Sequence, residues 1–267
     1  MNGSNAGIVD AATIKTAYFP GLIFGFRSPS VIASLKCGAT LNAAALETVI
    51  LFLDEVLPGA AASPTVITGT GPANIAATLA KTVLHAMREL YRAANLPLFE
   101  RGSLMGGDLA NGHAMVMVPT NTRALPLTTN ALEWLLGVVN AVQGGQKPQV
   151  FQDSLHELVT KFAALAPDGS NVPRFLRAAH EIGIPYAELP GTLYQFGHGA
   201  RARWMDSSFT DETPQIAARL ARNKVLSAAI LRRAGIPVPE HALVTSVEEA
   251  LTTATALGYP VVVKPAD

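Results

Sequence analysis

The sequence has little of what several classes of protein depend on. Its 267 residues include one cysteine, 6% aromatic residues and 15% charged residues. A single cysteine excludes an internal disulfide bond, and the six histidines show no spacing typical of a zinc site. The 20 basic residues balance the 20 acidic ones, so the bulk charge gives no reason to expect nucleic acid or a membrane as a partner.

Long hydrophobic runs are also missing. The apolar stretch over residues 18–26 is interrupted by Pro20, Gly21 and Gly25, and residues 1–7 are small and polar without a basic flank. We therefore expect no signal peptide, no membrane span and a cytoplasmic protein. What the sequence does have is 49% hydrophobic residues, enough for a well-filled core in one large domain or two ordinary ones.

The first half of the chain has clear hydrophobic periodicity. Apolar residues recur at helical spacing in three segments, and a short apolar run between the second and third is typical of a strand. In order, the pattern predicts a helix over residues 43–57 capped by Asn42, a helix over about 73–94, a strand over 113–118, and a helix that begins at Thr129 or Asn130. The glycines and proline of residues 143–148 predict a domain boundary there.

The second half is predicted to alternate helices with short strands. Cap residues, proline and glycine mark most of the ends. We expect one helix that carries Leu155 to Leu165, a second helix over about 173–182, and then a hairpin of strands 193–196 and 201–205 around Gly197-His198-Gly199. A helix opened by Thr213-Pro214 and continued from Asn223 to Gly235 should follow. The last expected elements are a helix from the capping box Ser246–Glu249 to Gly258 and a strand over 260–264.

Three motifs in this half carry a family resemblance. They are Asn223-Lys224, the run Leu231 to Pro239, and the run Ala256 to Pro265, which in this order resemble the opening of an ATP-grasp ligase domain. Three further stretches resemble cyanophycin synthetases: Phe175 to Pro185, Tyr194 to Gly199, and Thr210 to Thr213. The resemblance covers about residues 171–267. Before residue 171 only the order of the elements is similar, which is analogy at the level of the fold.

The resemblance implies an α/β fold class and a division into two domains. An α+β N-terminal domain over residues 1–147, with a possible role in binding substrate or primer, would be followed over 148–267 by the first α/β lobe of an ATP-grasp fold. The cofactors implied are ATP and Mg²⁺, and the substrate is an amino acid or peptide. Whether the protein forms a homo-oligomer is left open.

Two lysines match those that hold the nucleotide in ATP-grasp enzymes, Lys224 and Lys264. Two ammonium groups that converge on a phosphate chain offset its charge, and a compact charge on a flexible stem suits phosphate oxygens. The alternatives are a solvated lysine at a helix start for Lys224 and, for Lys264, a lysine whose ammonium reaches water from a strand end.

The chemistry that the resemblance implies is formation of an acyl-phosphate from a carboxylate and ATP, followed by attack of an amine. We assign no catalytic residue and no metal ligand within the chain. The ligands of Mg²⁺ and a glycine-rich phosphate loop are expected beyond Asp267, so the fragment alone is expected to be inactive. Two alternatives remain: another ATP-grasp dipeptide ligase, glutathione-like or making a glutamine peptide, or a non-catalytic substrate- or polymer-binding module.

Arg201 and Arg203 are a further pair whose role is left open. They alternate along a predicted strand, where they could face a carboxylate substrate or simply line an edge exposed to solvent. A hydrolase triad of His198, Asp206 and a serine of Ser207-Ser208 is a minor hypothesis, because no nucleophile-elbow motif accompanies it.

Overall fold

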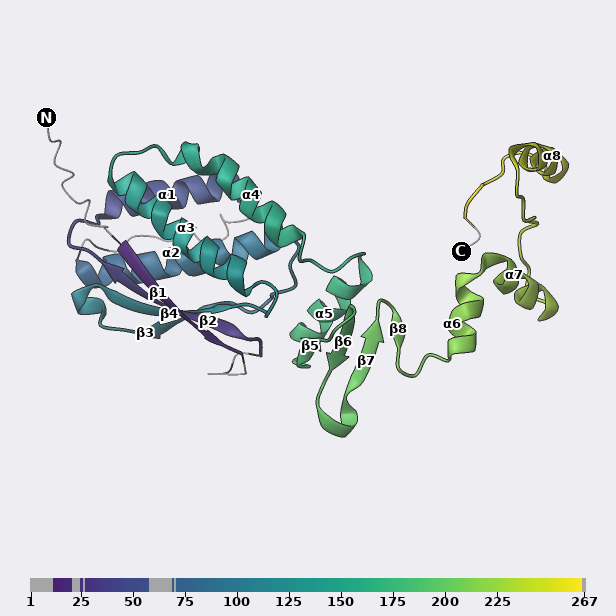
Figure 1. Cartoon of the computed structure of the whole chain (residues 1–267), viewed down its shortest axis with the longest axis horizontal. Coiled ribbons are helices and arrows are strands. Elements are labelled where there is room, and N and C mark those ends of the chain that lie inside the picture. The colour runs from purple at the N-terminus through teal and green to yellow at the C-terminus, as the bar shows by residue number, and fades with distance from the viewer. Residues whose placement is uncertain (1–11, 21–24, 26, 58–68, 70, 266–267) are drawn as a thin grey trace, which may run out of the picture. The chain divides into compact units, whose positions relative to one another are not determined.

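The chain divides into two units that together contain helices and two antiparallel sheets (Figure 1). The first unit comprises residues 1–187 and 196–198, and the second comprises residues 188–195 and 199–267. This mixture confirms the predicted fold class. The structure, a computed structural model, describes residues 12–20, 25, 27–57, 69 and 71–265.

The first unit is built on a four-stranded sheet of order β1-β2-β4-β3. All of its neighbouring strands are antiparallel, and β3 carries a bulge between Leu104 and Gly106. Of these strands only β4 was predicted from the sequence. The strands are β1 (Ala12–Phe19), β2 (Ser30–Cys37), β3 (Ser103–Gly106) and β4 (His113–Pro119).

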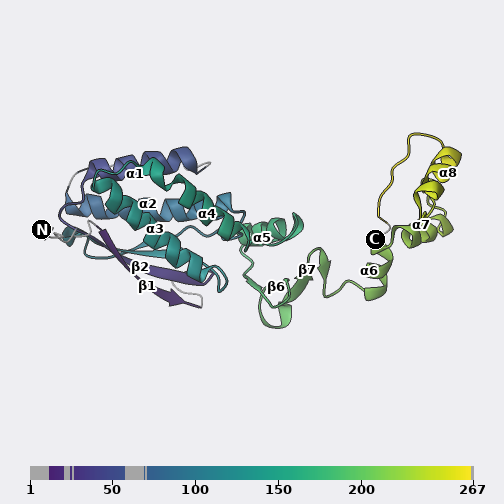
Figure 2. The ribbon, with the colours of Figure 1, turned by 45° about the horizontal axis from the view of Figure 1, so that its top comes forward.

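One face of this sheet is covered by helices (Figure 2). Along β2 the residues Val31, Ala33 and Leu35 are buried, whereas Ser34 and Lys36 are exposed, so the strand alternates between a core face and an open face. The helix α2 contacts β4 and α3 contacts β1, while α1 and α4 pack against these two helices. The helices are α1 (Ala43–Val56), α2 (Pro72–Ala93), α3 (Leu125–Gln143) and α4 (Gln152–Ala163).

Two of the predicted helices are confirmed almost to the residue. In α1 the side chain of Asn42 accepts a hydrogen bond from the amide of Ala45 at 2.9 Å, as expected of an N-cap. Pro58-Gly59, which follows this helix in the sequence and is expected to end it, lies outside the described residues. The second prediction, over about 73–94, corresponds to α2.

The predicted start of the third helix is wrong. This helix, α3, begins at Leu125 and not at Thr129 or Asn130. Its start is set upstream, because the side chain of Asn121 accepts from the amide of Ala124 at 2.7 Å and a proline lies in the first turn.

The core of the first unit extends past the predicted domain boundary. Beyond residue 148 a short 3₁₀ helix, η3 (Pro148–Phe151), leads into α4, whose Leu155, Leu158 and Phe162 belong to the same apolar cluster as the sheet and the other helices. The division into functional domains at 147 and 148 stays a prediction.

A buried chain of hydroxyl groups joins α2, β4 and α3. Tyr91 Oη donates to the carbonyl of Pro119 at 3.0 Å and lies 2.9 Å from Thr128 Oγ1, which in turn lies 2.8 Å from Thr120 Oγ1. The ring of Tyr91 meets that of Phe162 edge-on, with centroids 5.4 Å apart. Burial raises the pKa of the Tyr91 hydroxyl well above its usual value, with the hydrogen bonds opposing that rise. The network therefore ties the sheet to the helical layer with neutral groups.

The helix α5 (Asn171–Glu181) is the last helix of the first unit and ends, as predicted, before Gly183. Phe99 is flanked by two of its side chains, the guanidinium of Arg177 at 4.7 Å and the ring of His180 at 5.7 Å from the Phe99 centroid. These contacts hold α5 against the loop that precedes β3.

The second sheet has the order β5-β6-β7-β8. Its strands are β5 (Tyr186–Glu188), β6 (Leu193–Phe196), β7 (Arg203–Asp206) and β8 (Phe209–Thr210), with a 3₁₀ helix, η4 (Gly199–Arg201), between β6 and β7. The predicted hairpin is thus confirmed, although its second strand begins two residues late. Another 3₁₀ helix, η2 (Leu109–Asn111), precedes β4 in the first unit.

Three helices follow in the second unit, and no residue within them is buried. They are α6 (Gln215–Arg222), α7 (Lys224–Arg233) and α8 (Val247–Leu257). Within the described ranges, no helix of either unit has the length and apolar character that crossing a bilayer requires.

The predicted strand over residues 260–264 is wrong. Residues 261–265 have no regular secondary structure, and Val262 and Val263 are 85% and 78% exposed. A strand needs a neighbouring strand for its backbone hydrogen bonds, and within the described chain none pairs with this segment. Three β-branched residues alone do not supply that partner.

Replacing Thr128 by valine tests the hydroxyl network. The change keeps the shape of the side chain but leaves Tyr91 and Thr120 without a shared partner, which should lower the free energy of unfolding by about 1–3 kcal/mol. Urea denaturation followed by the fluorescence of Trp134, in a Trp204→Phe background, measures the loss. Thr48→Val, at an exposed site of α1, is the matched control and should change stability by less than about 0.5 kcal/mol. Equal effects of the two substitutions would contradict the role given to Thr128.

Cys37 offers a second test, based on pH. Burial raises the pKa of its thiol to about 11, so little thiolate is present in the folded protein near neutrality. At pH 8 a disulfide reagent such as Ellman's should therefore react at least about tenfold more slowly with folded protein than with protein unfolded in urea. Since the folded pKa is raised, the stability that the neutral thiol contributes is lost as the pH rises from the usual thiol pKa towards 11. Equal labelling rates would show that Cys37 is not held in this environment.

Candidate functional site

The two lysines expected to bind nucleotide phosphates both belong to the second unit. Lys224 is the first residue of α7, and Lys264 lies in the irregular segment 261–265; both are exposed. Within the described chain, neither ammonium group has a carboxylate at ion-pair distance. Among the described residues, no ion pair therefore neutralises the charge of either lysine. Their convergence on one ligand stays a prediction.

Lys224 is held in place by a sharp break between two helices. The amide of Asn223 donates to the carbonyl of Arg219 at 3.4 Å, which ends α6, and its side chain accepts from the amide of Leu226 at 2.9 Å, which begins α7. Ser227 Oγ donates back to the carbonyl of Leu220 at 2.5 Å. The predicted capping role of Asn223 is confirmed, but it starts a new helix and does not continue the previous one.

The charge of Lys224 is unfavourable for the helix that carries it. The first turn of an α-helix has unpaired amides and the positive end of the helix dipole, so a cation there is destabilising and an anion is favoured. An anion such as phosphate would meet the ammonium group and the free amides together. Lysine at this position therefore fits the binding of an anion better than it fits helix stability.

The end of α7 is fixed by a glycine. Gly235 has a φ of +74°, a left-handed conformation that side chains disfavour, and its amide donates to the carbonyl of Arg232 at 3.0 Å. The amide of Ile236 donates to the carbonyl of Leu231 at 3.0 Å, which completes a Schellman motif. The glycine stop predicted from the sequence is confirmed.

The next helix, α8, begins with the predicted capping box. Ser246 Oγ accepts from the amide of Glu249 at 3.1 Å, and Glu249 Oε2 accepts from the amide and the hydroxyl of Thr245 at 2.8 and 3.0 Å. These hydrogen bonds, the one from the Thr245 amide first, hold the pKa of Glu249 below its usual value. Gly258 then ends α8 and leads to the segment that carries Lys264.

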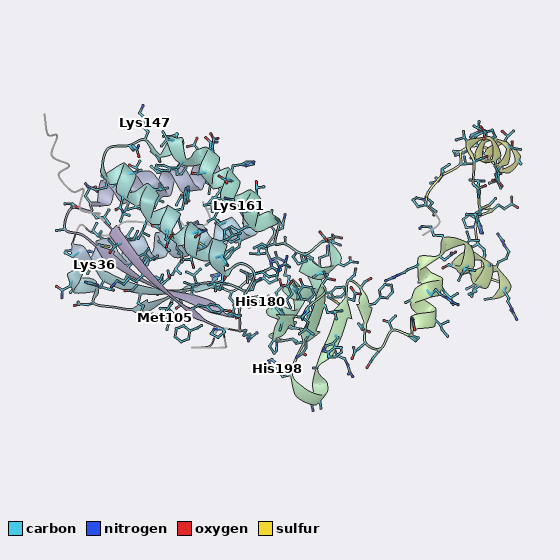
Figure 3. The ribbon with its side chains drawn as sticks, viewed as in Figure 1. Lys36, Met105, Lys147, Lys161, His180 and His198 are labelled. Carbon is cyan, nitrogen blue, oxygen red and sulfur yellow. The ribbon has the colours of Figure 1, made fainter. Side chains whose placement is uncertain are left out.

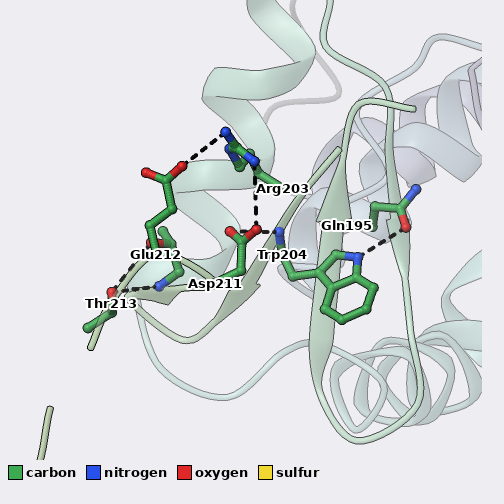
Figure 4. A network of polar contacts seen from close by, with 7 residues as sticks. Gln195, Arg203, Trp204, Asp211, Glu212 and Thr213 are labelled. Atoms are coloured by element: carbon green, nitrogen blue, oxygen red, sulfur yellow. Dashed lines mark hydrogen bonds and ion pairs between the residues drawn. The ribbon is translucent and has the colours of Figure 1, made fainter. Parts of the chain in front are cut away.

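A polar network on the second sheet was missed by sequence reasoning (Figure 4). Arg203 lies 2.9 Å from Glu212 Oε1 and 3.9 Å from Asp211 Oδ2. Two roles were left open for Arg203: facing a carboxylate substrate, or lining an edge exposed to solvent. The structure favours the second, because the guanidinium of Arg203 is ion-paired with acidic residues next to its own hairpin. Arg201 lies in η4 and is exposed. The only sequence signal for the network was the pair Asp211-Glu212 just after a strand.

No alternative chemistry emerges from the histidines. His198 is exposed in the turn after β6, and His180 lies on α5 (Figure 3). The described residues include no group of three or more histidine, cysteine or acidic side chains placed to hold a metal ion. Among them there is also no hydrogen bond from His198 to Ser207 or Ser208, so the hydrolase hypothesis gains nothing.

Comparison with known proteins finds a family match over the segment that carries Lys224 and Lys264. Residues 216–267 match the family model of the ATP-grasp domain. A stretch of 103 residues, 37% of this chain, is 32% identical to cyanophycin synthetase of Trichormus variabilis and covers 11% of that protein. The chain thus matches only a small part of the length of these curated relatives.

Two other kinds of relative share part of the chain. The carbamoyl phosphate synthase large chain of Thermomicrobium roseum is 38% identical over 104 residues, which is 37% of this chain and 9% of that protein. A D-alanine–D-alanine ligase of Pseudomonas putida is 39% identical over 51 residues, 19% of this chain and 16% of that protein. Proteins with different names are therefore each similar to part of this chain.

The two helix caps give a reciprocal test of how the site is held. Removing the Asn223 cap with Asn223→Ala should cost about 1 kcal/mol locally and speed amide hydrogen exchange at Leu226 roughly fivefold, with no change at Glu249. Ser246→Ala should do the reverse, so each variant is the control for the other. If either substitution accelerates exchange at both amides, the two helices are not capped independently.

The family match begins one residue into α6 and includes α7, α8 and both lysines. It also includes Asn223-Lys224, the run Leu231 to Pro239 and the run Ala256 to Pro265, which are the three motifs that resemble an ATP-grasp ligase domain. An ATP-grasp domain implies ATP as its ligand. Residues 216–267 of this chain thus belong to the ATP-grasp domain family.

Proposed function

We propose that this chain is part of an ATP-dependent ligase that joins a carboxylate to an amine, and that Lys224 and Lys264 bind the phosphates of ATP. The observation that carries the proposal is the position of Lys224 at the start of α7, inside the matched domain and without a carboxylate partner among the described residues. A cation at that end of a helix is explained by an anionic ligand.

The proposed reaction has two steps. A carboxylate oxygen of the first substrate attacks the terminal phosphorus of ATP, which forms an acyl-phosphate and releases ADP. The nitrogen of an amine then attacks the acyl carbon, and inorganic phosphate leaves as the amide bond forms. The two lysines would contribute charge neutralisation and positioning of the phosphates, and Mg²⁺, which is part of the proposal, would supply further positive charge.

The family match supports ATP as the nucleotide, whereas the proposed substrates rest only on similarity to individual relatives. Similarity to cyanophycin synthetase supports an amino-acid ligase. Aspartate and arginine are proposed as the substrates because the family resemblance implies them. A cytoplasmic setting is part of the proposal and comes from the sequence alone. Similarity to a D-alanine–D-alanine ligase supports a dipeptide ligase as the alternative. Residues 1–147 are proposed to bind the substrate or a primer.

Lysine substitutions test the nucleotide site. Binding of a fluorescent ATP analogue should weaken about tenfold or more in Lys224→Ala and in Lys264→Ala, because each loses a charge-assisted contact with phosphate worth about 1.5–3 kcal/mol. The matched control is Lys147→Ala, an exposed lysine of the first unit that should bind as the unchanged protein does (Figure 3). Unchanged affinity in both site variants would remove the two lysines from the nucleotide site.

A further inference from the structure

The outer edge of β1 is closed at its beginning by a side chain. Asn140, on α3, donates from Nδ2 to the carbonyl of Ala12 at 2.9 Å, and its Oδ1 accepts from the amide of Ala12 at 2.7 Å. These are the two hydrogen bonds that a neighbouring strand would make with Ala12. Because β1 stands at the end of the strand order, no strand of the described chain pairs with this edge.

The contacts of Ala12 determine which other residues of β1 direct their backbone groups to the outer edge. Ala12 is opposite Cys37 of β2, whose amide donates away from β1, to the carbonyl of Gly112 at 2.8 Å. Backbone groups alternate between the two sides of an antiparallel strand, so every second residue after Ala12 faces outwards. These residues are Ile14, Thr16 and Tyr18. Among the described residues nothing hydrogen-bonds to their outward N–H and C=O groups, which therefore form an open edge.

This open edge is symmetric about Thr16. One outward-facing residue lies two positions before Thr16 and one lies two positions after it, and beyond them the edge is closed on both sides. At Ala12 it is closed by the amide of Asn140, and Pro20 has no N–H to donate. A second β1, related by a two-fold axis at Thr16, would pair with all three open residues and bring each closed end opposite the other.

The side chains suit this antiparallel register. On the face that packs against the helices, Ile14 would lie opposite Tyr18 of the second copy, an aliphatic–aromatic pair that stabilises neighbouring strands. On the other face the exposed Lys15 would lie opposite the exposed Ala17. A register that set Ile14 opposite Thr16 would bring the two copies of Lys15 face to face, where they repel. Only the register centred on Thr16 pairs every open residue and separates the lysines.

We propose that two copies of this chain associate through β1, antiparallel and centred on Thr16, so that their first sheets join into one continuous sheet. The partner is a second copy because the open stretch is complementary to itself in length, in backbone pairing and in charge. Each copy uses its own β1 edge, so the association closes at the dimer. The interface lies in the first unit and does not depend on the proposed nucleotide site.

Substitutions of Ala17 test the register. Ala17→Glu sets a carboxylate opposite Lys15 of the second copy, twice by symmetry, whereas Ala17→Lys sets an ammonium group there. Sedimentation equilibrium should show a reversible monomer–dimer equilibrium whose dissociation constant falls about two- to tenfold in Ala17→Glu and rises by a similar factor in Ala17→Lys. Thr48→Glu and Thr48→Lys, at an exposed site of α1, add the same charges elsewhere and should leave the constant unchanged. A chain that is monomeric at every concentration, or a dimer that neither Ala17 substitution affects, overturns the proposal.

Thr16→Pro tests the backbone pairing. The N–H of Thr16 faces outwards, so proline removes no hydrogen bond within the sheet but takes a donor from the centre of the interface. The variant should keep the circular dichroism of the unchanged protein and be monomeric. If it does not fold, hydrogen exchange of the unchanged protein decides: the amides of Thr16 and Tyr18 should exchange more slowly as protein concentration rises, and that of Lys15, which faces β2, should change little. A folded Thr16→Pro variant that still dimerises, or edge amides whose exchange ignores concentration, would overturn the proposal.

Discussion

Among the described residues, most buried apolar side chains belong to one cluster, on the face of the first sheet beneath α2 and α3, and the stability of the first unit depends on it. The first unit is held by its core and by the hydroxyl groups of Tyr91, Thr120 and Thr128, which join the layers without a buried charge. In the second unit, α6 to α8 bury no residue, so their ends are set by local hydrogen bonds. The caps at Asn223 and Ser246 therefore determine where the helices of the family segment begin.

This division explains why Lys224, one of the two lysines of the proposed nucleotide site, is positioned by a helix end. A cap fixes a residue within one turn without needing a core, and it leaves amides and side chains of that turn open to a ligand. Lys224 occupies such a turn although its charge disfavours the helix. Several differently named relatives are each similar to part of this chain, and residues 216–267 match the ATP-grasp domain.

Local features of the fold could be predicted from the sequence, and features that need a distant partner could not. The helices α1, α2 and α8 were predicted because periodicity and capping residues lie within them or beside them. The strands β1 and β2 were missed, and a strand was wrongly placed at residues 260–264, because pairing depends on a second strand elsewhere in the chain. The capping role of Asn223 was foreseen for the same local reason. The ion pairs of Arg203 were not, since they depend on the register of a hairpin.

The central claim is that Lys224 and Lys264 contact the phosphates of ATP, and lysine footprinting tests it most directly. Each lysine would be acetylated under limiting reagent with and without ATP and Mg²⁺, and its modification quantified by mass spectrometry. The claim predicts that ATP protects Lys224 and Lys264, that adenosine protects neither, and that Lys147 is modified equally throughout. Modification of both site lysines at the same rate with and without ATP would contradict it.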